Sequence, residues 1–206
     1  MNNVKPSTTT PRFAAHIAAA LTLLSSVLLP PPTLAEDSRA ASVDLTPTPT
    51  KRSVEGATLE SVYFRAGSAR IEYMPPWPVL GQPDRAQLSV PVAGAQADIR
   101  RVVTGSPLDF GNDTAVTEFL LKQLPKDAES VEVAPLQRNP LRIDGKESAE
   151  LLASYVCFGR RLQLSTLISQ RAPGSEVYLF QVSSAPGDFK KIHRIFQSSL
   201  YTIAGF

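Results

Sequence analysis

The hydrophobic pattern between residues 160 and 183 predicts two paired β-strands. The stretch "EVYLFQVS" at 176–183 is apolar on both of its alternating sets of positions, which is typical of a central strand covered on both faces. The preceding stretch "RRLQLSTLIS" at 160–169 alternates apolar and more polar residues. Because "APGS" at 172–175 supplies turn residues between them, the sequence predicts a hairpin.

Upstream, "SAELLASYVCF" at 148–158 combines helix-favouring and strand-favouring residues. The tight-turn pair Asp144-Gly145 and the punctuating Gly159 favour a strand, which would make a meander of about four antiparallel strands beginning at "PLRI". Further strands are expected at four places: 69–73, 87–92, 99–104 and 130–136.

Two helices are expected. In "DTAVTEFLLKQL" at 113–124, apolar residues fall on one face, Asn112 or Asp113 can serve as N-cap, and Pro125 ends the helix. The stretch from 186 carries an apolar stripe at spacings of three and four: Phe189, Ile192, Phe196, Leu200 and Ile203. Burying five such side chains is worth on the order of 10 kcal/mol before entropy is subtracted, so the apolar face should decide where this helix lies. The alternative is a basic amphipathic helix on a membrane surface.

The first 35 residues have the order of a secretory signal peptide. They contain Lys5 and Arg12 and no acidic residue, then an apolar run from Phe13 to Leu29, then "TLA" before a predicted cleavage after Ala35. We therefore expect an exported protein, periplasmic or extracellular. The apolar run has about the minimum length of a spanning helix, so an uncleaved anchor stays open as the one route to membrane contact.

The predicted domain organisation has three parts. Residues 1–35 form the signal peptide, residues 36–56 form a flexible linker with two Thr-Pro steps and no apolar periodicity, and residues 57–206 form one domain. A domain of this size is large enough to bury a core.

Charge and composition argue against several functions. The chain has 21 basic and 19 acidic residues, and removal of Lys5 and Arg12 leaves 19 of each, so nucleic-acid binding has no compositional support. Without the first 35 residues, His193 and Cys157 are the one histidine and the one cysteine, too few for a His/Cys metal site or an intrachain disulfide. We expect no metal and no cofactor.

Catalytic motifs are also missing. The sequence has no Gly-x-Ser-x-Gly elbow and no phosphate-binding glycine loop. Cys157 is predicted to be a buried small hydrophobe, and His193 to be structural or incidental. The carboxylate pairs Asp109 with Asp113 and Glu147 with Glu150 lie in contexts typical of loops, caps and edges, so no catalytic residue is predicted.

The best candidate for a binding surface is an aromatic and proline-rich segment within "EYMPPWPVLGQP" at 72–83. Proline removes backbone donors and stiffens the chain, so this segment should leave the sheet and present its aromatics from a rigid loop. The predicted partner-binding residues are Tyr73, Met74, Pro75, Pro76 and Trp77. Alternatively, Trp77 caps the core at the end of a strand.

The order of elements resembles the PsbP-like superfamily. The resemblance covers about residues 60–206 and rests on "YMPPW", the strand "GSEVYLFQVS", a Gly-Asp-Phe turn and a last helix ending "IFQSSL". It implies an α+β fold in which an antiparallel sheet is sandwiched between helices. It also implies a function in binding partners rather than in chemistry.

Three functions follow from the sequence, in this order. The first is a non-enzymatic exported domain that binds a protein partner through the aromatic–proline segment or an edge strand. The second is a carrier of a small apolar ligand in a pocket between sheet and helix, with Tyr155, Tyr178 or Phe180 lining it. The third is a hydrolase that uses carboxylates, which would need two acids facing each other in one cleft.

Overall fold

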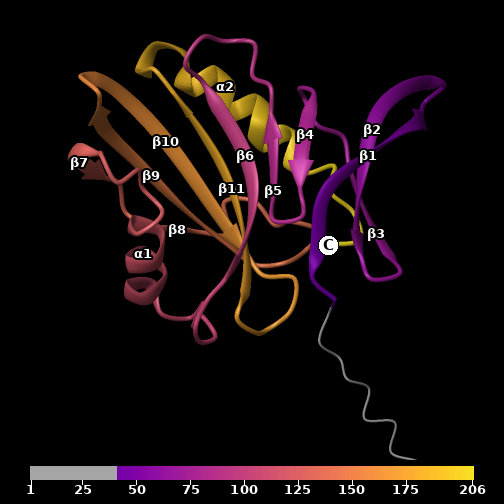
Figure 1. Ribbon diagram of the computed structural model, residues 1–206, viewed down its shortest axis with the longest axis horizontal. Coiled ribbons are helices and arrows are strands. Elements are labelled where there is room, and N and C mark those ends of the chain that lie inside the picture. Colours follow the sequence, from indigo (N-terminus) through magenta and orange to yellow (C-terminus); the bar gives the residue numbers. More distant parts are fainter. Residues whose placement is uncertain (1–40) are drawn as a thin grey trace, which may run out of the picture. The chain divides into compact units, whose positions relative to one another are not determined.

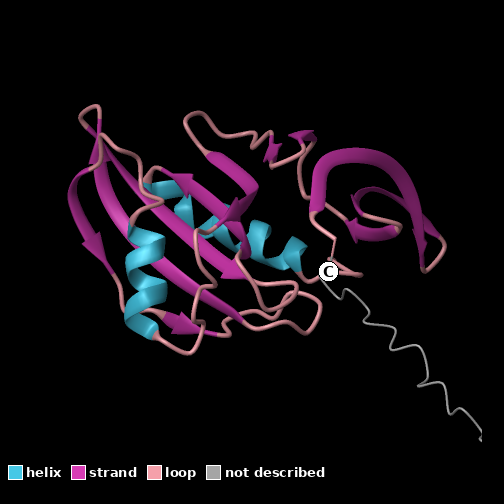
Figure 2. Ribbon diagram, turned by 60° about the horizontal axis from the view of Figure 1, so that its bottom comes forward, coloured by secondary structure: helices cyan, strands magenta, loops and turns pink. Residues whose placement is uncertain are grey.

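The computed structural model describes residues 41–206, as two antiparallel sheets and two helices (Figures 1 and 2). The predicted signal peptide lies outside the described residues. The smaller sheet has the order β1-β2-β3, and the larger has the order β4-β5-β6-β11-β10-β9-β7, with β8 paired to β9. The first six strands are β1 (Val43–Val54), β2 (Ala57–Ala66), β3 (Ala69–Tyr73), β4 (Val79–Gln82), β5 (Arg85–Leu88) and β6 (Gln96–Val103). The remaining elements are α1 (Asp113–Leu121), β7 (Glu129–Val133), β8 (Gln137–Arg138), β9 (Ser148–Cys157), β10 (Arg160–Ser169), β11 (Glu176–Ser184) and α2 (Pro186–Leu200). The expected α+β class is confirmed.

β11 is the central strand that its sequence predicts. It pairs with β10 on one side and β6 on the other, both antiparallel, and its residues alternate between two apolar clusters. Tyr178, Phe180 and Val182 join the main core with α2, whereas Val177 and Leu179 join a second core with α1. Since neighbouring side chains of a strand point to opposite faces, α1 and α2 contact opposite faces of β11.

The predicted apolar stripe is buried, with every member at most 9% exposed. Ile192, Phe196 and Leu200 of α2, and Ile203 just beyond its end, join the main core with residues of both sheets. The helix begins at Pro186, whose missing N–H costs nothing at that position. On α1, the side chain of Asn112 accepts a hydrogen bond from the Ala115 N–H, which confirms the predicted N-cap.

Both tight turns predicted beside β9 are present. Asp144-Gly145 and Phe158-Gly159 all have positive φ, which is the backbone that a two-residue hairpin turn requires. The strand at 148–158 is therefore confirmed. "PLRI" is not a strand, however, because it makes only the isolated bridge between Ile143 and Lys146, so the meander is β9-β10-β11 and its next neighbour is β6. The strand expected at 87–92 likewise ends at Leu88, three residues before Pro91.

The predicted flexible linker at 36–56 is wrong for most of its length. β1 runs from Val43 to Val54 and pairs with β2 along its length, with one register shift between Asp44 and Thr48. Val43 and Leu45 are buried in the main core, and prolines are tolerated here because β1 is an edge strand. The ordered domain therefore includes β1 and does not begin at residue 57.

β1 also approaches β4 closely at Gly81. A Cβ atom at this position would lie 2.4 Å from the Leu45 carbonyl oxygen and 2.5 Å from Pro47 Cδ. We expect Gly81→Ala to lower the free energy of unfolding by about 1–3 kcal/mol, because β1 must move to relieve the overlap. Chemical denaturation of the variant beside Gly105→Ala, whose Cβ would meet nothing within 4 Å, measures this effect. Equal stability of the two variants would contradict the close approach.

Candidate functional site

The aromatic–proline segment divides between the core and the surface. Tyr73 ends β3 and is fully buried, with its hydroxyl 2.8 Å from Ser199 Oγ on α2. Burial raises the pKa of this phenol. Tyr73 is therefore a core residue, and its expected role as a surface contact is wrong. It is the last residue of β3 and points into the core before the prolines turn the chain.

The four residues after Tyr73 form a half-buried loop. The Met74 N–H donates to Thr202 Oγ1 at 2.9 Å, which ties the loop to the residues after α2. Pro75, Pro76 and Trp77 are each partly exposed, and Trp77 also packs against the main core. Trp77 thus combines the two alternatives: one part of its ring caps the core and another part faces solvent.

A groove of about 500 Å³ lies between this loop and the β1–β2 hairpin, and we call it the Trp77 groove. The loop side is lined by Pro75, Pro76, Trp77, Pro78 and Val79, and the hairpin side by Pro49, Thr50, Lys51, Glu60, Ser61 and Val62. Its walls are mostly apolar. Lys51 and Glu60 stand opposite each other in the β1–β2 register and add one charge of each sign.

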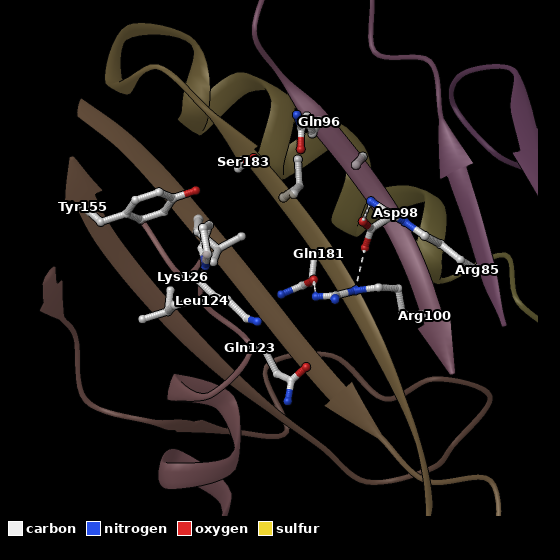
Figure 3. Close-up of a pocket in the computed structure, with 14 residues that line it drawn as sticks. Arg85, Gln96, Asp98, Arg100, Gln123, Leu124, Lys126, Tyr155, Gln181 and Ser183 are labelled. Carbon is white, nitrogen blue, oxygen red and sulfur yellow. Dashed lines mark hydrogen bonds and ion pairs between the residues drawn. The ribbon is translucent and has the colours of Figure 1, made fainter. Parts of the chain in front are cut away.

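A second, polar cavity of about 310 Å³ is lined by residues of β5, β6, β9, β10 and β11 and by the turn after α1 (Figure 3). Asp98 on β6 stands between two arginines, with Arg85 Nη2 2.6 Å from Oδ2 and Arg100 Nε 3.4 Å from Oδ1. Arg100 also donates to Gln181 on β11. The amide of Gln181 then donates to Thr166 Oγ1 on β10 at 2.8 Å. We call this chain across four strands the polar ladder.

The place of the polar cavity follows from the residues of β11 and from the length of α1. On the face of β11 that α1 contacts, the side chains change from Val177 and Leu179 to Gln181 and Ser183. α1 ends at Leu121, so the turn at 123–126 lies over the polar part and supplies Gln123, Leu124, Pro125 and Lys126 to the lining. This site was not predicted from the sequence. A signal was present in "ADIRR", where the charged residues Asp98 and Arg100 stand at alternate positions and therefore share one face of the strand.

His193 belongs to a buried cluster under α2. Its Nε2 lies 2.8 Å from Oε1 of Glu150, which also accepts from Ser165 Oγ at 2.6 Å and from Gln197 Nε2 at 3.1 Å. Glu150 is 2% exposed. Burial by itself raises the pKa of this carboxyl, but the hydrogen bonds from His193 and Ser165 and the charge of His193 outweigh it, so the pKa lies below its usual value.

The chemistry of this cluster is that of a satisfied buried acid. Ser165 and His193 both bind the same carboxylate oxygen, so the histidine is not placed as a base for the serine hydroxyl. The candidate carboxylates are engaged elsewhere or differ in burial: Asp113 accepts from Arg138 Nε at 2.7 Å, and Asp109 accepts from the Gly111 N–H. Glu150 is buried, whereas Glu147 is exposed. Over residues 41–206, no group of three or more His, Cys, Asp or Glu side chains is placed to hold a metal ion.

The space beside the expected ligand-binding aromatics is filled. Tyr178 and Phe180 adjoin a cavity of only about 10 Å³, because Phe206 packs edge-on against both rings, with centroids 5.1 and 6.1 Å away. Tyr155 instead lines the polar cavity. Cys157 is half-buried and has no disulfide partner among the described residues.

Comparisons with known proteins assign no family. No family model matches the chain, and no curated protein is significantly similar to it. Among solved structures, it is similar to PA94 of Pseudomonas aeruginosa, a protein of unknown function, with 16% identity, a TM-score of 0.44, and coverage of 76% of this chain and 96% of that one. It is also similar to LpqN of Mycobacterium tuberculosis, which is involved in cell envelope biogenesis, with 14% identity, a TM-score of 0.43, and coverage of 79% and 91%. Neither helix within residues 41–206 is long and apolar enough to cross a membrane.

Proposed function

We propose that this chain is a non-enzymatic exported domain that binds an extended segment of a partner protein in the Trp77 groove. The observation that carries the proposal is the groove itself, about 500 Å³ of mostly apolar surface between two ordered elements. Residues 1–35 support export by their pattern, and the two helices on opposite faces of β11 support a PsbP-like sandwich.

The groove is preorganised for binding. Three prolines flank Trp77, and the Met74 N–H is held by Thr202 next to α2, so the loop loses little freedom when a partner docks. A half-exposed tryptophan in such a setting is a typical binding hot spot, because it offers a large apolar area at low entropic cost. The partner segment should place apolar side chains between Trp77 and Pro49.

The rim of the groove adds a constraint on the partner. Lys51 and Glu60 lie on the hairpin side and are both exposed, so each can pair with an opposite charge or an amide of the partner. Charges at the rim influence association rate and orientation more than affinity. The bound segment should therefore be apolar in its middle and polar at one end.

The experiment is an affinity capture of tagged residues 36–206 from the native extracytoplasmic fraction, run beside Trp77→Ala. We expect a protein that the wild type retains and the folded variant loses, because truncation of a hot-spot aromatic costs about 2 kcal/mol or more. Phe158→Ala is the matched control, since it removes an aromatic that is 86% exposed at the β9–β10 turn.

Two results would contradict the proposal. One is a captured protein that Trp77→Ala retains as well as the wild type does. The other is loss of the protein with Phe158→Ala as well as with Trp77→Ala, which would mean nonspecific hydrophobic capture. Circular dichroism of each variant confirms that it is folded before the capture is interpreted.

A further inference from the structure

The polar cavity is a site that the proposed function does not use. Its lining holds three cationic side chains, Arg85, Arg100 and Lys126, and one acidic side chain, Asp98. We propose that it binds a small organic anion through a carboxylate or phosphate group. Figure 3 shows four members of the polar ladder in the cavity, Arg85, Asp98, Arg100 and Gln181, together with Gln123 and Lys126 from the turn after α1.

The charges of the cavity do not balance. Asp98 is 7% exposed and lies within 4 Å of both arginines, so it compensates for one positive charge while its neighbours supply two. Lys126 adds a third. The excess positive charge faces a partly enclosed space, where an anion is attracted more strongly than on open surface.

The ladder also fixes the direction of its donors. Arg100 is held by Asp98 on one side and by Gln181 on the other, and Gln181 is in turn held by Thr166. Arg85, by contrast, is bound through Nη2 to Asp98 and is 48% exposed, so its remaining N–H groups can face a ligand. The paired N–H groups of the Arg85 guanidinium match the two oxygens of a carboxylate or phosphate.

The ladder is costly if it serves stability alone. Asp98, Gln181 and Thr166 are buried on a sheet face whose other half is apolar and packed under α1. Replacing buried ion pairs by apolar residues is often neutral or stabilising, so a scaffold role alone does not require them. A binding role explains why this half of the face is polar and is left uncovered by the helix.

The size of the cavity and its neutral groups restrict the ligand. A volume of about 310 Å³ suits a small metabolite rather than a polymer. The Tyr155 hydroxyl, the Ser183 hydroxyl and the Gln123 amide also line it, so the ligand should carry hydroxyl or carbonyl groups besides the anion.

The test is a titration of residues 36–206 with inorganic phosphate and, separately, with citrate in low-salt buffer, followed by ¹H–¹⁵N NMR. We expect saturable shifts confined to the amides of 123–126 and 181–183, with a Kd of about 1 mM or lower for at least one anion. Which of the two anions binds more tightly distinguishes a phosphate site from a carboxylate site.

Three variants decide whether the cavity is responsible. Lys126→Ala and Arg85→Gln should each weaken binding about ten-fold or more, whereas Arg160→Gln, which removes an exposed arginine at the β9–β10 turn, should not change it. Lys126 lies on a turn outside the ladder, so its variant tests binding even if Arg85→Gln unfolds. Absence of saturable shifts with both anions, or equal affinity of wild type and Lys126→Ala, would overturn the proposal.

Discussion

Replacement of Glu150 by alanine is expected to lower the free energy of unfolding by about 3–5 kcal/mol. The reason is that one buried carboxylate accepts hydrogen bonds from Ser165, His193 and Gln197. Removing it leaves three buried or half-buried donors without their acceptor, and each loses its compensation for desolvation. Urea denaturation measured by circular dichroism gives the change.

The control for this prediction is Glu147→Ala, which removes an exposed acid three positions earlier. We expect it to change stability by less than about 0.5 kcal/mol. If the two variants were equally stable, the cluster under α2 would contribute nothing measurable, and His193 would be incidental rather than structural.

The same residue predicts a dependence of stability on pH. The pKa of Glu150 is lowered in the folded protein, so the folded state favours the ionised form, and this stabilisation is present above the unfolded pKa of about 4.5. It is lost as the pH falls through the lower, folded-state pKa. Below pH 4.5 the wild type should therefore lose stability more steeply than Glu150→Gln, which has no proton to gain. Parallel curves would contradict this assignment.

Truncation of Phe196 to alanine is the other change with a large expected effect, about 3–5 kcal/mol. Phe196 is 2% exposed and lies at the centre of the apolar stripe of α2, in contact with the main core that both sheets share. Thermal and urea denaturation measure the loss. A large effect means that the apolar face of α2 determines its position, as the sequence predicts.

Ile195→Ala is the matched control because it removes an aliphatic side chain from the position directly before Phe196 on the same helix. Ile195 is 37% exposed and faces away from the stripe, so we expect a loss below about 1 kcal/mol. If Ile195→Ala were as destabilising as Phe196→Ala, the burial of one face of α2 would not explain its docking.

Local patterns were sufficient to predict β9, β10, β11 and α2. In β10, β11 and α2 the spacing of apolar residues fits only one type of element. The turns at Asp144-Gly145 and Phe158-Gly159 mark the two ends of β9. The burial of β11 on both faces follows from the apolar run from Val177 to Phe180, since a half-exposed strand would alternate apolar and polar residues.

β1 could not be predicted in the same way. Its sequence, "VDLTPTPTKRSV", has apolar residues only near its two ends and has two prolines, which is typical of a linker. What orders it is β2, which supplies the partner for its length, and Gly81, which leaves room for its backbone. Both are tertiary effects that the local pattern does not contain.

The binding surfaces were predictable only in part. The prolines of 75–78 correctly indicated a loop outside the sheet. The Trp77 groove forms only because the β1–β2 hairpin provides its opposite wall. Tyr73 was assigned to the surface because the sequence does not show that β3, with its alternation of buried and exposed side chains, extends as far as this residue. The polar ladder joins residues from four strands, so its members are not close together in the sequence.

The pairing of β6 with β11 has a consequence for how the protein folds. Arg100 and Gln181 are neighbours in the sheet but 81 positions apart in the chain. The centre of the large sheet therefore cannot close until nearly all of the domain has been synthesised, and contacts of such long range make folding slow. Until β11 pairs, β6 and β10 each expose an edge without a partner strand. Such edges promote aggregation, so they are the surfaces that a chaperone would need to protect.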